Sequence, residues 1–143
     1  MRPINQTQIS FSSNSVNEGY ARAAVAAFLS QLDPTVADLS DIRTAVSEAV
    51  TNAIVHGYRD SLGTVYISVK IYGDGRAQVR VRDKGGGIPD VKQAMEPLFT
   101  TGGEERAGLG FAVMQSFCDS VRVSSTVGKG TSVTLTKRFT PKC

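Results

Sequence analysis

Tryptophan is absent from the 143-residue sequence, and cysteine and histidine are scarce, with two copies and one copy. Cys118 and Cys143 have neither the spacing of a metal site nor that of a disulfide framework, so we expect reduced thiols in a cytoplasmic protein. A run of about 18 apolar residues is also missing, which argues against a membrane span. Residues 1–6 lack the apolar core of a secretory signal, which again favours the cytoplasm.

Charge of one sign is not concentrated anywhere in the chain. The 16 lysines and arginines and the 13 aspartates and glutamates give a net charge of +3, and 41% of the residues are hydrophobic. Arg76, Arg80 and Arg82 are interleaved with apolar residues, as on the solvent-exposed face of a strand. A nucleic-acid surface would need basic side chains gathered along one groove. We therefore expect a globular domain that does not contact nucleic acid directly.

The hydrophobic pattern shows no internal repeat or linker, so we expect one domain over residues 1–143. In chain order it predicts a short strand near residues 9–11, helices over 16–32 and about 36–56, a strand pair over 65–82, a loop over 85–103, a helix over about 110–118 and a second strand pair over 121–137. Each strand has one apolar face. The predicted fold is therefore a two-layer α/β sandwich, in which helices cover one face of a mixed, mainly antiparallel sheet.

Local signals mark the ends of the two long helices. Pro34 disfavours helical geometry at Asp33 and should end the first helix. Thr35 is a suitable N-cap for the second helix, and Asp38 three residues later completes a capping-box pattern. Gly57 is expected to end the second helix.

Glu48 and Asn52 are four residues apart and share one face of the second helix, where they interrupt an otherwise apolar segment. They fit an exposed stripe on an amphipathic helix. They also fit a chemical pair, in which the carboxylate orients or deprotonates a nucleophile and the amide oxygen binds Mg²⁺. Magnesium prefers oxygen ligands and keeps water and phosphate oxygens in its shell, so one protein oxygen would be sufficient.

Asp83 continues the inward register of the second strand and is followed at once by Gly85 and Gly87. An inward carboxylate needs a hydrogen-bond donor, and the exocyclic amine of adenine is one. Guanine has an oxygen acceptor at that position and would be repelled. Glycines allow the backbone to approach a ligand closely. A tight turn beside a solvated aspartate is the structural alternative.

Gly108, Leu109 and Gly110 are expected to open the third helix, where free N–H groups and the helix dipole favour phosphate. The segment is not a P-loop, because Leu109 stands where that motif has its lysine. It is also a poor dinucleotide fingerprint, because no strand directly precedes it. Gly130-Thr131 fits a hairpin turn first of all.

These motifs follow one another as Glu48-x-x-x-Asn52, Asp83-x-Gly85-x-Gly87, Gly108-x-Gly110 and Gly130-Thr131. The order resembles the N, G1, G2 and G3 boxes of the GHKL superfamily, which includes DNA gyrase, heat-shock chaperones, histidine kinases and the mismatch-repair ATPase. The resemblance implies the Bergerat ATP-binding fold.

Within that superfamily, most of the chain is similar to the anti-sigma-F factors of endospore-forming bacteria. The similar stretches are residues 17–22, 28–35, 47–58, 97–101 and 108–111. The resemblance implies a dimeric serine kinase that binds and silences a sporulation sigma factor. It also implies phosphorylation of a serine on a small anti-anti-sigma protein, with Mg-ATP as the phosphoryl donor.

The same resemblance assigns roles to individual residues. Glu48 would be the catalytic base, Asn52 the magnesium ligand and Asp83 the group that recognises adenine. Gly85 and Gly87 would line the base pocket. The other residues expected around ATP or ADP are Ala53, His56, Ile88, Thr100, Arg106, Gly108, Leu109, Gly110 and Thr131.

Three residues, Arg106, His56 and Arg22, each have a functional interpretation and a plain structural alternative. Residues 91–107 would form a lid over the nucleotide, but the stretch 102–106 is shorter and less basic than in relatives, and Arg106 could equally be a solvated loop residue. His56 could contact phosphate or ribose, or it could pack against the helix end. Arg22 could face a protein partner, or it could simply be exposed.

Two other functions fit the same motifs. A switch kinase of the general stress response would differ only in the sigma factor that it binds. A non-catalytic binding module would use ATP to set its conformation and would transfer no phosphate.

Overall fold

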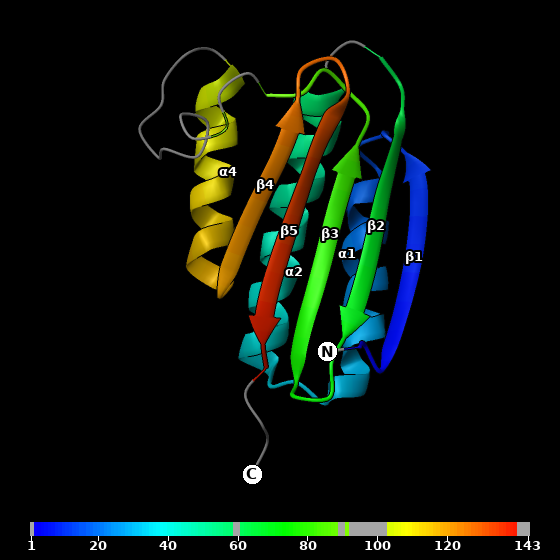
Figure 1. The fold of residues 1–143 in the computed structure, drawn as a ribbon, viewed down its shortest axis with the longest axis vertical. Helices are drawn as coiled ribbons and strands as arrows, with labels where there is room; N and C mark the ends of the chain where they lie inside the picture. The colour runs from blue at the N-terminus through cyan, green and yellow to red at the C-terminus, as the bar shows by residue number, and fades with distance from the viewer. Residues whose placement is uncertain (1, 59–60, 89–90, 92–102, 140–143) are drawn as a thin grey trace.

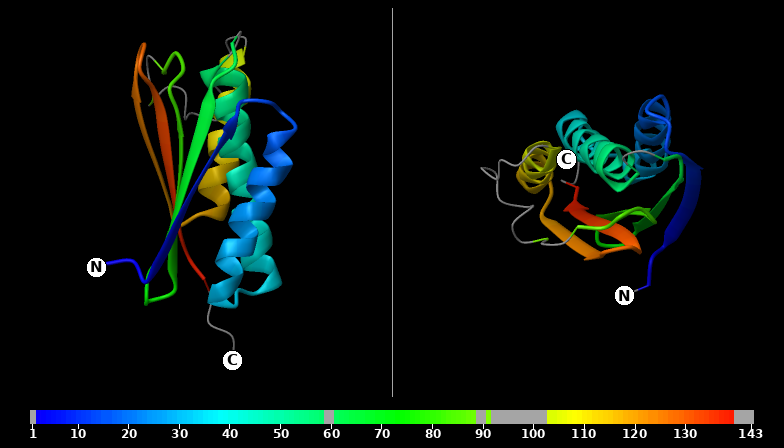
Figure 2. Two further views of the ribbon diagram at one scale, coloured as in Figure 1. Left: turned by 90° about the vertical axis from the view of Figure 1, so that its right-hand side faces the viewer. Right: turned by 90° about the horizontal axis from the view of Figure 1, so that it is seen from above.

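The computed structural model describes residues 2–58, 61–88, 91 and 103–139, and of residues 103–109 it describes the backbone alone. The fold has two layers, with three helices side by side on one face of a five-stranded sheet (Figures 1 and 2). Helix α2 lies between α1 and α4 (Figure 2). The predicted two-layer α/β sandwich is confirmed.

The sheet has the strand order β1-β2-β3-β5-β4, and all four pairings are antiparallel. The sheet was predicted to be mixed and mainly antiparallel, whereas the described strands are antiparallel throughout. Their bounds are β1 Asn5–Ser12, β2 Thr64–Ile71, β3 Arg76–Asp83, β4 Ser120–Thr126 and β5 Gly130–Arg138. Both predicted hairpins, β2–β3 and β4–β5, are present, and β1 is longer than predicted.

The helices are α1 Asn17–Leu29, a 3₁₀ turn η1 Ser30–Leu32, α2 Val36–Asn52, a π-helical turn η2 Ala53–Gly57, and α4 Gly103–Phe117. The first helical segment ends as predicted, at Asp33, whose backbone is left-handed with φ 51°. The predicted cap is also present, because the amide of Asp38 donates to Thr35 Oγ1 at 3.0 Å. No described helix is both long enough and apolar enough to cross a lipid bilayer.

Alternation along the strands places the apolar side chains against the helices. On β2, every second residue from Val65 to Ile71 is buried. These side chains pack in one hydrophobic core with residues from α2, such as Ile42 and Val46, and with Phe111 of α4. Burial of this continuous apolar surface holds the three helices on the sheet.

The third long helix begins earlier than predicted. Helix α4 starts at Gly103, not near Gly110, so Gly108 and Gly110 lie within the helix and do not open it. The prediction of free N–H groups at a helix start formed by Gly108–Gly110 was therefore wrong. Gly110 serves helix packing here and not a helix start, since a Cβ atom there would lie only 3.1 Å from the Asn52 side chain of α2.

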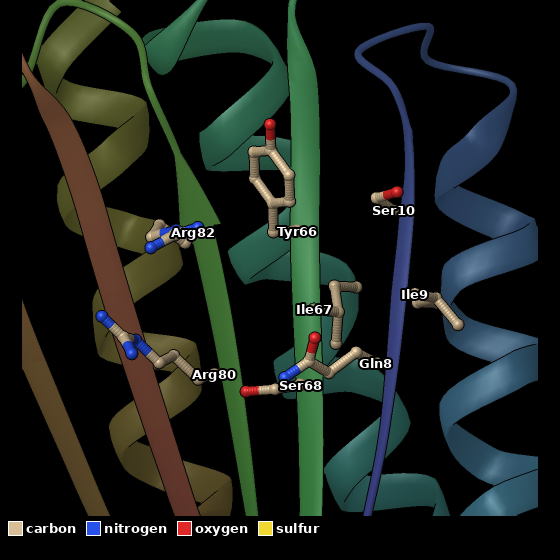
Figure 3. A pocket seen from close by; sticks show the side chains of 8 residues that line it. All are labelled: Gln8, Ile9, Ser10, Tyr66, Ile67, Ser68, Arg80 and Arg82. Carbon is tan, nitrogen blue, oxygen red and sulfur yellow. The ribbon is translucent and has the colours of Figure 1, made fainter.

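None of the described helices covers the other face of the sheet (Figure 2), and polar side chains lie on it (Figure 3). A hollow on this face is lined by residues of β1, β2 and β3, namely Gln8, Ile9, Ser10, Tyr66, Ile67, Ser68, Arg80 and Arg82. Arg80 donates to Ser132 Oγ at 2.6 Å, and the Arg82 guanidinium lies 5.0 Å from the centre of the Tyr66 ring. The predicted solvent-facing register of these arginines is confirmed.

Candidate functional site

The elements that carry the predicted motifs meet at one end of the molecule, at the top in Figure 1. The last residues of β3, the C-terminal end of α2, the first turns of α4 and the β4–β5 turn all lie there. The hydrophobic layer below them fixes their spacing. Motifs that are far apart in the sequence therefore form one site.

Helix α4 brings Gly110 against the polar pair of α2. A Cβ atom at Gly110 would lie 3.1 Å from Asn52 Nδ2 and 3.2 Å from Glu48 Oε2. The Asn52 Nδ2 atom is buried and has no hydrogen-bond partner within the described part of the chain. An amide buried in this way carries a free-energy cost unless another group pairs with it. The interpretation as an exposed stripe fails, because both side chains are partly buried beneath α4.

Asp83 ends β3 with its carboxylate inside the protein, as the strand register predicts. The residue is 5% exposed, and its Oδ1 accepts a hydrogen bond of 2.9 Å from the Gly85 amide. Burial raises the pKa of the Asp83 carboxyl above its ordinary value of 3.8, although backbone hydrogen bonds from Gly85 and Thr131 act in the opposite direction. The alternative of a solvated aspartate is therefore wrong, and the site holds a carboxylate with unused acceptor capacity.

Two glycines make room for this carboxylate and its strand. A Cβ atom at Gly57 would lie 2.7 Å from Asp83 Cγ and 2.8 Å from both carboxylate oxygens. A Cβ atom at Gly130 would overlap the Asp83 carbonyl oxygen. Neither position tolerates a side chain without displacing Asp83.

The loop after β3 is held by backbone contacts on both sides. A Cβ atom at Gly85 would overlap the Gly57 carbonyl oxygen, and the same oxygen accepts a hydrogen bond of 3.1 Å from the Gly86 amide. Gly87 has φ 78° and packs against the carbonyl of Thr126, the last residue of β4. The glycines were predicted to allow a ligand to approach, and in the structure they also allow backbone to approach backbone.

Ser125 connects the loop to Thr131. Its hydroxyl accepts from the Ile88 amide at 2.7 Å and lies 2.8 Å from Thr131 Oγ1. Thr131 is 8% exposed and pairs with Asp83 in the sheet. Predicted residues Asp83, Ile88 and Thr131 therefore belong to one hydrogen-bonded cluster.

A family model for the histidine kinase-like ATPase domain matches residues 11–137. An anti-sigma F factor of Thermoanaerobacter sp. (strain X514) is 52% identical over 138 residues, which are 96% of each chain. The chain belongs to the anti-sigma F factor family. Another member, from Geobacillus kaustophilus, is 55% identical over 137 residues, covering 94% of this chain and 93% of that one.

Solved structures support the same fold for this anti-sigma F factor family member. The RsbU and RsbW domains of a Mycobacterium tuberculosis protein match 96% of this chain and 32% of that one, with a TM-score of 0.71 and 24% identity. A histidine kinase domain from Erythrobacter litoralis matches 85% of this chain and 61% of that one, with a TM-score of 0.55 and 19% identity. The predicted GHKL resemblance is confirmed.

Membership of an ATPase domain family implies that the chain binds ATP or ADP. The described residues fit such a ligand on two observations. Asp83 keeps a buried acceptor available for an amine, and Asn52 has a buried polar atom without a protein partner. The carboxamide oxygen of Asn52 is also a suitable donor for Mg²⁺.

Not every predicted residue can be placed. Thr100 lies outside the described residues, as does most of the predicted lid. Gly108, Leu109 and Arg106 lie in α4, whose backbone is described at these positions without their side chains. Ala53 and His56 lie in the π-helical turn η2, where Ala53 is buried and His56 is partly buried.

Sequence reasoning missed three residues of the site. Gly57 was identified only as a helix stop, although it seats the Asp83 carboxylate. Ser125 and Tyr58 were not singled out, and both make hydrogen bonds to the loop after β3. Their partners are distant in the sequence, so no local pattern identifies them.

Proposed function

We propose that this protein is an anti-sigma factor and a serine kinase that acts in the cytoplasm. It binds and inhibits a sporulation sigma factor, and it phosphorylates a serine of an anti-anti-sigma protein with Mg-ATP. The relatives named anti-sigma F factor support the first activity, and the ATPase domain family supports the second.

The observation that carries the proposal is the buried environment of the Asp83 carboxylate. A carboxylate at the end of a strand, 5% exposed and enclosed by Gly57 and Gly130, is costly unless a ligand uses it. The exocyclic amine of adenine is a donor for this carboxylate, whereas the corresponding oxygen of guanine would repel it. The Asp83 carboxylate would therefore select adenine nucleotides over guanine nucleotides.

The polar pair of α2 would supply the chemistry. Asn52 would hold Mg²⁺, which neutralises phosphate charge when bound. Glu48 would accept the proton of the serine hydroxyl as the serine Oγ–phosphorus bond forms and the bond between the terminal phosphorus and its bridging oxygen breaks. ADP is the leaving group, and phosphoserine is the product. Atoms and charges balance without another reactant.

A homodimer is part of the proposal. Strand β1 is at the edge of the sheet, and β2 is its one partner among the described strands. An uncovered edge can pair with a second copy across a two-fold axis.

Titration calorimetry with Mg-ATP, Mg-ADP and Mg-GTP tests the nucleotide site. We expect adenine nucleotides to bind and GTP to bind at least about tenfold more weakly, since one lost hydrogen bond and one repulsive contact exceed 1.4 kcal/mol together. Equal affinities for ATP and GTP would contradict the role of Asp83. Absence of any magnesium-dependent binding would contradict the proposal as a whole.

Labelled ATP and a serine-bearing anti-anti-sigma protein test transfer. The Glu48→Ala variant is expected to bind ATP nearly as the wild type does and to lose phosphoryl transfer, while a serine-to-alanine partner serves as the acceptor control. Equal loss of binding and transfer would remove Glu48 as the base. If the wild-type protein binds ATP but transfers no phosphate to the serine, it is a non-catalytic binding module.

A pull-down with ATP, with ADP and without nucleotide tests the sigma partner. The sporulation sigma factor is expected to be retained in a nucleotide-dependent manner. Retention of a stress-response sigma factor alone would identify the protein as the corresponding stress switch kinase.

A further inference from the structure

The hydroxyl group of Tyr58 lies between two strands of the sheet. It donates to the Thr64 carbonyl oxygen at 2.7 Å and accepts from the Lys84 amide at 2.7 Å. Thr64 is the first residue of β2, and Lys84 directly follows Asp83, the last residue of β3. The hydroxyl therefore joins the two strands at the end that carries the predicted adenine-binding carboxylate.

The strand register shows what the hydroxyl replaces. Tyr66 is opposite Arg82, so a continued ladder would place Thr64 opposite Lys84. At the far end of the same ladder, in the same alternation, the Tyr72 amide donates directly to the Arg76 carbonyl at 2.9 Å. A regular sheet would thus have a direct bond from the Lys84 amide to the Thr64 carbonyl. In this protein, the Tyr58 hydroxyl is inserted into that bond.

The ring of Tyr58 is fixed by its surroundings. A Cβ atom at Gly63 would overlap the ring, so only glycine leaves space for it there. The Gly63 carbonyl oxygen accepts a hydrogen bond of 2.9 Å from the Ser13 amide, and the Gly63 amide donates one of 2.9 Å to the Ser13 hydroxyl group. The Tyr58 amide donates to the Ala53 carbonyl at 3.2 Å across the π-helical turn η2. The side chain therefore has little freedom to leave its place.

We propose that Tyr58 is a positioning residue for nucleotide recognition, an inference that rests on the proposed function. Its hydroxyl keeps the ends of β2 and β3 apart and holds the Lys84 amide, so that the Asp83 carboxylate stays over Gly57. Because Tyr58 directly follows η2, it also couples the helix that carries Asn52 to the strand that carries Asp83. Without the hydroxyl, a direct hydrogen bond from the Lys84 amide to the Thr64 carbonyl would draw the Asp83 carboxylate away from its position over Gly57.

The Tyr58→Phe variant tests this role, because it removes the hydroxyl and keeps the ring on Gly63. We expect its KM for ATP in serine phosphorylation to rise about tenfold and its preference for ATP over GTP to fall by a similar factor. Its kcat should change less than about threefold, since Glu48 and Asn52 lie on α2. Tyr66→Phe is the matched control, since it removes a hydroxyl from the open face of the sheet and should change neither quantity.

The outcomes separate this proposal from the one before it. A wild type without adenine-nucleotide binding contradicts the proposed function. A wild type that binds ATP, together with a folded Tyr58→Phe variant of unchanged KM and unchanged nucleotide preference, overturns the role of Tyr58 alone. A variant with reduced thermal stability but unchanged preference also overturns it, because a merely structural role lowers stability without altering selection.

Hydrogen exchange of the wild type gives a second test that needs no variant. The Lys84 side chain is exposed, yet its amide is hydrogen-bonded to Tyr58 and should exchange slowly without nucleotide. Exchange of this amide at the rate of an unprotected loop would overturn the proposal. Slow exchange in nucleotide-free protein would support it.

Discussion

The position that a Cβ atom would occupy at Gly57 lies 2.7 Å from Asp83 Cγ. The two residues are far apart in the sequence, and one belongs to the turn after α2 while the other ends β3. The Asp83 carboxylate can therefore occupy its position only because residue 57 is a glycine without a side chain. This contact joins the helical layer to the sheet at the centre of the candidate site.

The Gly57→Ala variant should lose nucleotide affinity. Its methyl group would push the Asp83 carboxylate out of register with the adenine amine, and we expect the Kd for ATP to rise about tenfold or more. Titration calorimetry measures it. Gly19→Ala is the control, since a Cβ atom at Gly19 in α1 meets nothing within 4 Å and should leave the affinity unchanged. A Gly57→Ala variant that binds ATP as the wild type does would contradict this arrangement.

The Asp83→Asn variant should be more stable than the wild type without nucleotide, although it binds ATP more weakly. Burial raises the pKa of Asp83 in the folded state, so the protonated form is the one that folding favours. The stability that this group contributes is complete below its unfolded pKa and is lost as the pH rises through the folded pKa. Asparagine stays neutral and avoids that loss.

Thermal unfolding as a function of pH tests the predicted direction of this stability difference. The melting temperature of Asp83→Asn relative to the wild type should increase from about pH 4, near the unfolded pKa, towards neutral pH. With saturating ATP, the order should reverse, because the ligand stabilises the form that binds it. A variant that is less stable than the wild type at neutral pH without nucleotide would refute the account.

The strands were predictable because the alternation of apolar and polar residues is local. Val65 to Ile71 alternate, and the structure buries that same set against the helices. The inward direction of Asp83 follows from the same period of two, so its burial was predictable as well. Thr35 as a helix cap is likewise a local signal that the structure confirms.

Features that depend on tertiary contacts were not predictable. Gly108 and Gly110 favour a helix start by sequence, yet α4 begins at Gly103, and Gly110 lies within the helix against Asn52 and Glu48. The π-helical turn η2 likewise has no sequence signal, and it places Gly57 under Asp83. Neither the start of α4 nor the turn η2 can be identified from the sequence, because both depend on contacts between residues that are far apart in the chain.

Replacement of Lys137 should destabilise the protein through α4. Lys137 of β5 is 9% exposed, and its ammonium group donates to the carbonyl of Phe117, the last residue of α4, at 2.9 Å. It also lies 3.8 Å from Asp41 of α2. Lys137→Met keeps the aliphatic chain and removes both interactions and the favourable charge at the helix end, at a cost of about 1–2 kcal/mol.

Urea unfolding measures this difference. Lys129→Met is the control, since Lys129 is exposed in the β4–β5 turn and should unfold within about 0.5 kcal/mol of the wild type. Equal midpoints for Lys137→Met and Lys129→Met would show that the bond to α4 contributes nothing.

Cys118 should react slowly with thiol reagents in the folded protein. Burial raises the pKa of its thiol from 9.0 to about 11, and Asp119 and Asp41 add to the rise while Lys137 opposes it. The thiolate is the reactive form, so this shift lowers the reactive fraction about 100-fold at pH 8. Alkylation by iodoacetamide in a Cys143→Ser variant isolates this one thiol. The folded protein should react about 100-fold more slowly than the chain unfolded in urea, and equal rates in both states would contradict the burial of Cys118.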